Sequence, residues 1–257
     1  MQLPYVYCLG NFQANQISIF PETISSRKIK PELEQKLVSA WEQLQKQAND
    51  DGKQVWDSEL YRLEAVKKRK DNLDITLSTI LFSTRKMITQ YLPEVLSLGE
   101  DYFSKGMFSS IFIRTSDNLY AFLKKSNLFV ARNNYSFVGG AYSKAEQKIS
   151  NGQDLFEIAR KEIFEELNIT DNDVRNISMI SIFITSQTHT CFLFDCQLNL
   201  TSQELIEKYN LSHDPESSEL ILLHLEQIEE FLTKNLPGDV NKMELFMQAQ
   251  HLPTLSL

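Results

Sequence analysis

Three glutamates lie within five residues in the stretch Lys161–Ile169, on what the surrounding pattern predicts to be an amphipathic helix. At about 3.6 residues per turn, Glu162 lies one turn before Glu165 and Glu166, so the three side chains share a face. Like charges at this spacing repel, at a cost of roughly 0.2–0.5 kcal/mol per pair. A hard divalent cation such as Mg²⁺ would remove the repulsion, because it binds carboxylate oxygens and keeps several waters. The stretch therefore predicts either a magnesium site or a solvated acidic helix face.

The residues before the acidic stretch favour the magnesium site. Gly139 and Gly140 follow what reads as the end of a strand, and a diglycine turn lets backbone approach a ligand closely. Asn151 to Asp154 offers a turn and an N-cap for a helix that begins near Leu155. The expected buried stripe of that helix consists of Leu155, Ile158, Ala159, Ile163 and Leu167. The acidic residues lie off this stripe, so we expect them to face a cleft.

The segment from Gly139 to Ile169 resembles a Nudix box. Its usual pattern is a glycine, five residues, Glu, seven residues, then Arg-Glu-x-x-Glu-Glu-x-Gly and an aliphatic residue. The matching residues are Glu162, Glu165 and Glu166 on the three carboxylates, with Ile163 and Ile169 on the aliphatic positions.

Three residues depart from the Nudix pattern. Lys161 stands where Arg is usual, Gln153 where the first Glu is usual, and Asn168 where Gly is usual; the loop from Gly140 to Gln153 is about seven residues too long. Asn168 can still end the helix in the left-handed conformation. Lys161 keeps the charge of Arg without its bidentate fork. Gln153 lacks a negative charge, which would weaken a second metal site, and the effect of all three on activity stays open.

The departures resemble one branch of the superfamily, the hydrolases of UDP-glucose and UDP-galactose. That branch has a lengthened loop, a helix that begins near Leu-Phe, as at Leu155-Phe156, and an Asn after the acidic core. Further similarity lies at 55–57, 61–63, 200–209 and 215–217. Residues 77–87 do not match the Tyr-Arg-rich segment of the branch, which leaves the sugar and the base open.

The resemblance implies hydrolysis of a nucleotide sugar to UMP and a sugar 1-phosphate, with Mg²⁺, or alternatively Mn²⁺, as the cofactor. The implied roles are metal binding by Glu162, Glu165 and Glu166, general-base catalysis by Glu165, orientation of a neighbouring carboxylate by Lys161, and phosphate binding by the backbone N–H groups of Gly139 and Gly140.

Other side chains have two interpretations each. Glu216 or Glu219 is either a further metal ligand or a surface acid, and Tyr61 and Tyr135 either stack on uracil or pack in the core. His189 is expected to be structural.

Two alternative functions remain. A degenerate Nudix domain would bind a nucleotide or a protein partner without turnover, which Gln153, Lys161 and Asn168 favour. Alternatively, a Nudix hydrolase would act on another diphosphate, such as ADP-ribose or a dinucleotide.

Composition restricts the partners. The 257 residues include 26 Lys and Arg against 34 Asp and Glu, a net charge of −8, which argues against broad nucleic-acid or membrane-surface binding. Three cysteines without a pairing pattern predict a reducing compartment, and Cys191 and Cys196 are expected on opposite faces of a strand. The chain has no apolar run of about 20 residues, so we expect a cytoplasmic protein. The resemblance implies a small-molecule nucleotide sugar as its partner. Its oligomeric state stays open.

The order of elements predicts an α/β (α+β) protein with two domains. A smaller N-terminal α+β domain would span residues 1–105 and a Nudix hydrolase domain residues 106–257, with a boundary in 99–106. The resemblance implies an α/β/α sandwich around a mixed sheet for the second domain. Expected strands are 60–66, 73–82, 109–115, 119–124, 179–185, 190–198 and 220–225, with two more within 5–20; expected helices are 30–48, 84–91 (ended by Pro93), 155–167, 203–209 and one from 228. The basic run 67–70 is expected in a solvated turn.

Overall fold

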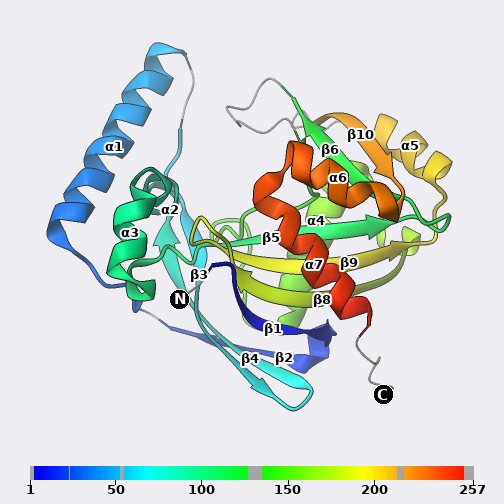
Figure 1. Ribbon diagram of the computed structural model, residues 1–257, viewed down its shortest axis with the longest axis horizontal. Helices are drawn as coiled ribbons and strands as arrows, with labels where there is room; N and C mark the ends of the chain where they lie inside the picture. The colour runs from blue at the N-terminus through cyan, green and yellow to red at the C-terminus, as the bar shows by residue number, and fades with distance from the viewer. Residues whose placement is uncertain (1–2, 23, 53–54, 127–134, 213–216, 252–257) are drawn as a thin grey trace.

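The computed structural model, which describes residues 3–22, 24–52, 55–126, 135–212 and 217–251, is built on a large mixed sheet (Figure 1). Its strands lie in the order β1 (Tyr5–Phe12), β8 (Val174–Ile184), β9 (Thr190–Leu198), β5 (Met107–Arg114), β6 (Tyr120–Lys125) and β10 (Ser217–Leu223), and β7 (Tyr135–Ser136) also pairs with β6. β5 and β9 run parallel, and the other neighbours run antiparallel. The predicted mixed sheet is confirmed.

A smaller sheet of β2 (Ile17–Pro21), β4 (Asn72–Leu81) and β3 (Glu59–Arg69) stands beside the large one. β2 is parallel to β4, and β3 and β4 form an antiparallel hairpin. The hairpin turns at Lys70, whose φ is 51°. The basic run 67–70 is exposed, as predicted, but residues 67–69 continue β3 and only Lys70 lies in the turn.

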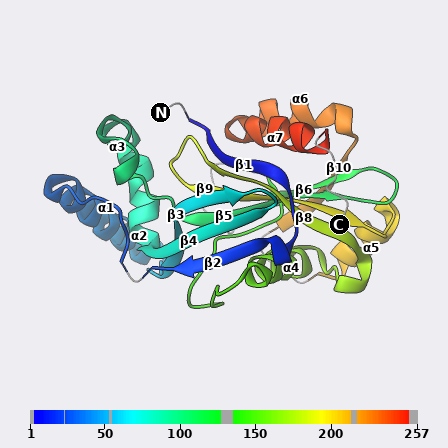
Figure 2. The ribbon, with the colours of Figure 1, turned by 90° about the horizontal axis from the view of Figure 1, so that it is seen from below.

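Helices cover both faces of the large sheet. Figure 2 shows α4 (Gly152–Leu167) on one side of the sheet and α6 (Leu225–Asn235) with α7 (Val240–Gln250) on the other. The remaining helices are α1 (Pro31–Asp50), α2 (Phe82–Ile88), α3 (Leu92–Leu98) and α5 (Ser202–Asn210), and the short 3-10 helices are η1 (Ala14–Gln16), η2 (Thr89–Tyr91), η3 (Glu100–Tyr102), η4 (Asp171–Asp173) and η5 (Pro237–Asp239). The predicted three-layer α/β/α arrangement is therefore present. Within the described residues, no helix is both long and apolar enough to cross a membrane.

Two apolar cores lie on the two faces of the sheet. Cys196 belongs to the core under α4, whereas Cys191, five residues earlier on β9, belongs to the core under α6 and α7. The predicted placement of these cysteines on opposite faces is confirmed. Both thiols are free, and burial raises the pKa of each to about 12, so neither is a reactive thiolate at neutral pH.

The ends of α4 are determined by local sequence. Asn151 is the N-cap: its side-chain oxygen accepts a hydrogen bond from the backbone N–H of Asp154, whose carboxylate in turn accepts one from the backbone N–H of Asn151.

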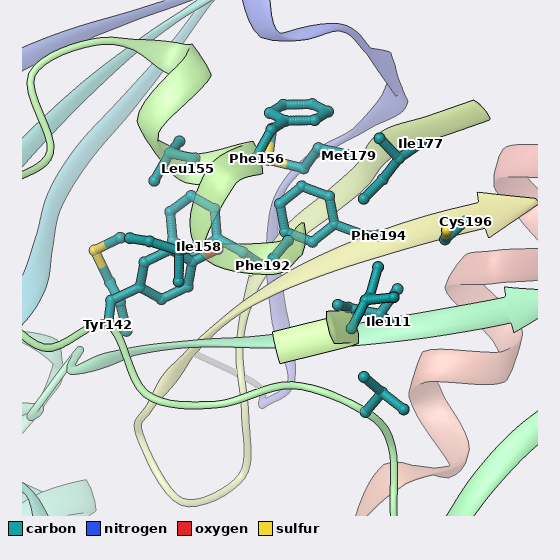
Figure 3. Packing of buried hydrophobic residues seen from close by; sticks show 14 of the residues in the cluster. Ile111, Tyr142, Leu155, Phe156, Ile158, Ile177, Met179, Phe192, Phe194 and Cys196 are labelled. Atoms are coloured by element: carbon teal, nitrogen blue, oxygen red, sulfur yellow. The ribbon is translucent and has the colours of Figure 1, made fainter. Parts of the chain in front are cut away.

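The predicted apolar stripe of α4 is buried, and Figure 3 shows Leu155, Phe156 and Ile158 beside Phe192 and Phe194 of β9. This packing fixes the rotation of the helix about its axis, and with it the direction of the glutamates.

Asn168 ends α4 in the left-handed conformation, as predicted, with φ 57° and ψ 35°. We expect Asn168→Ala to lower the free energy of unfolding by about 1 kcal/mol, because alanine tolerates this conformation less well. Asn168→Gly should be neutral or stabilising. Urea denaturation checks both variants. Equal destabilisation by Ala and Gly would instead assign the loss to the hydrogen bond from Asn168 Nδ2 to the carbonyl oxygen of Lys208 (3.4 Å).

Part of the helical structure was missed. The expected helix 84–91 is present as α2 and η2 and ends before Pro93, but Pro93 then lies in the first turn of a further helix, α3, where its missing N–H costs nothing. Helix α7 was not predicted, although it covers the core that contains Cys191.

The first hundred residues contribute to both sheets. β1 pairs with β8 at the edge of the large sheet, whereas β2, β3 and β4 form the smaller sheet. The predicted boundary between residues 105 and 106 falls just before β5, and the division of the chain into two domains there stays a prediction.

Candidate functional site

A cleft of about 790 Å³ opens between α4, the diglycine segment and the first residues of β3 and α2. Its lining residues include Gly139, Gly140, Glu146, Lys161, Glu162, Glu165 and Glu166, together with Ser58, Leu60 and Phe82 from the front half of the chain. The structure thus brings all six predicted site residues to one cleft. The two apolar side chains that the front half of the chain adds to this lining, Leu60 and Phe82, were not predicted.

Glu162 lies at the back of the cleft, against the diglycine. A Cβ atom added to Gly140 would lie 2.4 Å from Glu162 Oε1, so a larger residue would displace this carboxylate from its present position. Burial, followed by the charges of Glu166 and Glu165, raises the pKa of Glu162 to about 7. The repulsion predicted from the sequence is therefore present in the folded chain.

Glu166 lines the cleft, as predicted, but it is buried, with only 5 % of its surface exposed. Its Oε2 accepts a hydrogen bond from the backbone N–H of Gly139 (3.0 Å), and its Oε1 lies 3.3 Å from Lys125 Nζ. A buried carboxylate is tolerated when it is paired in this way. Glu166 consequently ties α4 to the diglycine segment.

The diglycine does not present its N–H groups to the cleft, which contradicts the predicted phosphate contacts of Gly139 and Gly140. Gly139 donates to Glu166, and Gly140 donates to Ser109 Oγ (3.2 Å). Gly139 has a φ of +135°, and a Cβ there would lie 2.5 Å from the carbonyl oxygen of Ser109. The two glycines therefore line the cleft and bring the chain close to α4, while their donors stabilise the protein itself.

Lys161 pairs with an acid that was not predicted. Its Nζ lies 2.7 Å from Glu146 Oε2 and 3.7 Å from Glu165 Oε1. Glu146 follows Gly140 after five intervening residues, where the Nudix pattern has its first glutamate. The extra residues therefore lie between Glu146 and Lys161, and assigning the first-glutamate position to Gln153 was wrong. Counting forward from Gly140, rather than back from the helix, would have found Glu146.

Glu165 differs from the other two acids because its side chain is 51 % exposed. It faces the cleft and has Lys161 one turn before it on the same helix. An exposed carboxylate that lines a cleft is accessible to water, as a general base has to be.

The side chains with two interpretations mostly have structural roles. Tyr61 is buried, and its hydroxyl accepts a hydrogen bond from the backbone N–H of Ile149 (2.9 Å). His189 is buried as well, as expected. Glu219 forms a surface ion pair with Lys124 (3.0 Å), whereas Glu216 lies outside the described residues.

The donor set of the cleft fits a magnesium ion that keeps water ligands. In the part of the chain that the structure describes, no group of three His, Cys, Asp or Glu side chains is arranged to hold a metal by itself. Mg²⁺ commonly takes only one or two carboxylates from the protein and completes its shell with water and substrate phosphates. Glu162 and its neighbours are such donors, and the raised pKa of Glu162 is the electrostatic cost that a cation would relieve.

The raised pKa of Glu162 predicts how stability depends on pH without metal. Between pH 4.5 and 7 the folded chain binds more protons at this carboxyl group than the unfolded chain does, so the free energy of unfolding falls as pH rises through this window. The slope should stay below about 1.4 kcal/mol per pH unit, the limit for one proton. Urea denaturation in EDTA at several pH values measures it, and Glu162→Gln should flatten the curve. If the variant and the parent chain share one pH dependence, the carboxyl group titrates elsewhere.

Comparison with known proteins gives matches among solved structures alone. No family model matches the chain, and no curated protein matches it. A protein from Deinococcus radiodurans aligns at 18% identity and a TM-score of 0.41, over 56% of this chain and 82% of its own. The MutT protein of Methanosarcina mazei Go1 aligns at 15% identity and a TM-score of 0.34, over 57% of this chain and 96% of its own. A Nudix hydrolase from Nitrosomonas europaea aligns at 11% identity and a TM-score of 0.36, over 58% of this chain and 93% of its own. Similarities of this size establish neither a family nor an activity, so the function has to be argued from the cleft.

Proposed function

We propose that this chain is a Nudix-type, magnesium-dependent hydrolase of a nucleoside diphosphate-sugar. The expected substrates are UDP-glucose and UDP-galactose, and the expected products are UMP and a sugar 1-phosphate. The observation that supports the proposal most strongly is the cluster of Glu162, Glu165 and Glu166 on one wall of the cleft, with Lys161 bound to Glu146 beside it. All five residues occupy the positions that the Nudix pattern gives to these types of charge.

The residues of the cleft have different tasks in this proposal. Glu162, Glu165 and Glu166 would hold Mg²⁺, which would offset the charge that develops on the phosphate and acidify a water ligand. Glu162 and Glu166 are held in place by burial and by the diglycine, and they supply fixed oxygen donors. Glu165 is exposed and serves as the general base that takes a proton from the attacking water. Lys161 orients Glu165, whose Oε1 lies 3.7 Å from its Nζ.

A panel assay tests this function. The chain is incubated with UDP-glucose, UDP-galactose, ADP-ribose or a dinucleotide polyphosphate, in Mg²⁺ or in EDTA, and the released phosphate monoesters are measured. We expect UMP from the two UDP-sugars in Mg²⁺ and none in EDTA. Turnover of ADP-ribose alone would reject the uridine substrates but keep the chemistry.

A binding module without turnover is the second candidate. It is favoured because no three side chains in the described ranges form a metal site and because Gly139 and Gly140 use their N–H groups internally. Saturable binding of UDP-glucose with no hydrolysis of any substrate in the panel would support this candidate and overturn the hydrolase.

A further inference from the structure

A second cavity, of about 310 Å³, adjoins the acidic cleft through Gly139, which lines both. Its character is opposite to that of the cleft, because it contains the cations Arg85 from α2 and Lys242 from α7. It lies beside β5, where Ser110 contributes a hydroxyl group.

Arg85 lines this cavity without a hydrogen-bond or ion-pair partner among the described residues. Its guanidinium makes no ion pair or hydrogen bond with any described residue, and its Nε atom is buried and unsatisfied. It stacks over the ring of Phe108 (5.7 Å), and a Cβ on Gly106 would lie 2.7 Å from its Cδ, so a glycine leaves room for it. Arg85 is half-buried, and burial lowers its pKa to about 10. The fold thus holds a half-buried arginine that forms no ion pair with a described residue.

The second cation is already neutralised. Lys242 Nζ lies 2.7 Å from Asp239 Oδ1 and donates to Ser110 Oγ (2.9 Å). Among the described lining residues, Asp239 is the sole acid. The excess charge of the cavity is therefore the one positive charge of Arg85. Ser136 adds a buried hydroxyl oxygen that lacks a hydrogen-bond partner.

We propose that this cavity binds a single phosphate group on the fork of Arg85. A guanidinium donates two parallel hydrogen bonds to a phosphate, and the remaining phosphate oxygens can be met by the hydroxyl of Ser136 and the ammonium of Lys242. The volume suits inorganic phosphate or a small phosphate monoester. This site does not depend on the proposed hydrolysis, because it uses none of the acids of the cleft.

Calorimetric titration in EDTA tests the site while excluding metal-dependent binding in the cleft. Inorganic phosphate, UMP and glucose 1-phosphate are the ligands, with chloride at equal ionic strength as the blank. Arg85→Met should weaken phosphate binding at least tenfold. Lys86→Met is the matched control, because Lys86 is an exposed cation on the same helix, and it should bind phosphate as the parent chain does.

Thermal unfolding separates a binding role for Arg85 from a structural one. Without phosphate, Arg85→Met should unfold at the same or a higher temperature than the parent chain, since it removes an uncompensated charge. Binding of the monoesters alone would identify an organic phosphate as the ligand, whereas binding of all three probes would identify the phosphate group itself. Three results would overturn the proposal: no binding above the chloride blank, unchanged binding by Arg85→Met, or a clear loss of thermal stability in that variant.

Discussion

Replacing Glu165 with glutamine should lower the rate of diphosphate hydrolysis by about 10²- to 10⁴-fold, the usual contribution of a general base. The amide keeps the size of the side chain but cannot accept a proton from water. Because the Glu165 side chain is 51 % exposed, the fold should not change. The measurement is the initial rate of UMP release from UDP-glucose in Mg²⁺, with circular dichroism to check the fold.

Glu157→Gln is the matched control for this experiment. Glu157 is exposed on the same helix but does not line the cleft, so the variant makes the same change of charge outside the site. It should retain the parent rate. Full activity of Glu165→Gln would show that another group is the base.

Gly140→Ala should lower the hydrolysis rate by about 10²-fold without unfolding the chain. The added Cβ would lie 2.4 Å from Glu162 Oε1, and the end of this flexible side chain is the group that has to move. A displacement of about 1 Å in a catalytic group costs rates of that order. Rates measured over a range of Mg²⁺ concentrations should show weaker Mg²⁺ binding, as a higher half-saturating concentration, because Glu162 is no longer held in place.

Substitutions at two other glycines serve as comparisons for Gly140→Ala. Gly139→Ala should destabilise the chain by about 2–4 kcal/mol, because a positive φ combines with a clash against the carbonyl oxygen of Ser109. Gly238→Ala should change neither rate nor stability, since its Cβ would meet no atom within 4 Å. If Gly140→Ala loses stability as Gly139→Ala does, its effect on rate would not report on Glu162.

The sequence was sufficient for elements that are determined by local patterns. The capping residues Asn151 and Asn168, and the four-residue spacing from Leu155 to Leu167, predicted α4 within a few residues of its observed bounds. The odd separation of Cys191 and Cys196 likewise gave their faces, because strand geometry alone decides it.

Features that depend on distant contacts could not be predicted in this way. Glu166 is buried because Lys125 and the backbone of Gly139 compensate it, and neither contact can be read from helix spacing. The adjacent apolar pair Leu245 and Phe246 of α7 gives no clear single stripe, and this helix is buried by its packing on β1 and β8.

In the cleft, too, some features follow from local sequence and others from distant contacts. The acidic cluster could be predicted, because its three glutamates lie on one helix and their spacing places them on one face. The partner of Lys161 lies across a loop, at Glu146, and only the folded chain brings the two together. In the second cavity, the position of Arg85 likewise depends on Gly106 and Phe108, which follow it by more than twenty residues.

A crystal structure of the chain soaked at neutral pH in millimolar Mn²⁺, as an anomalous substitute for Mg²⁺, tests the central claim most directly. We predict an anomalous peak in the acidic cleft, within about 2.0–2.3 Å of a carboxylate oxygen of Glu162 and of at least one of Glu165 and Glu166. A cleft without such a peak, in crystals that show Mn²⁺ bound elsewhere, would contradict the assignment of these acids as metal ligands and, with it, the proposed hydrolysis.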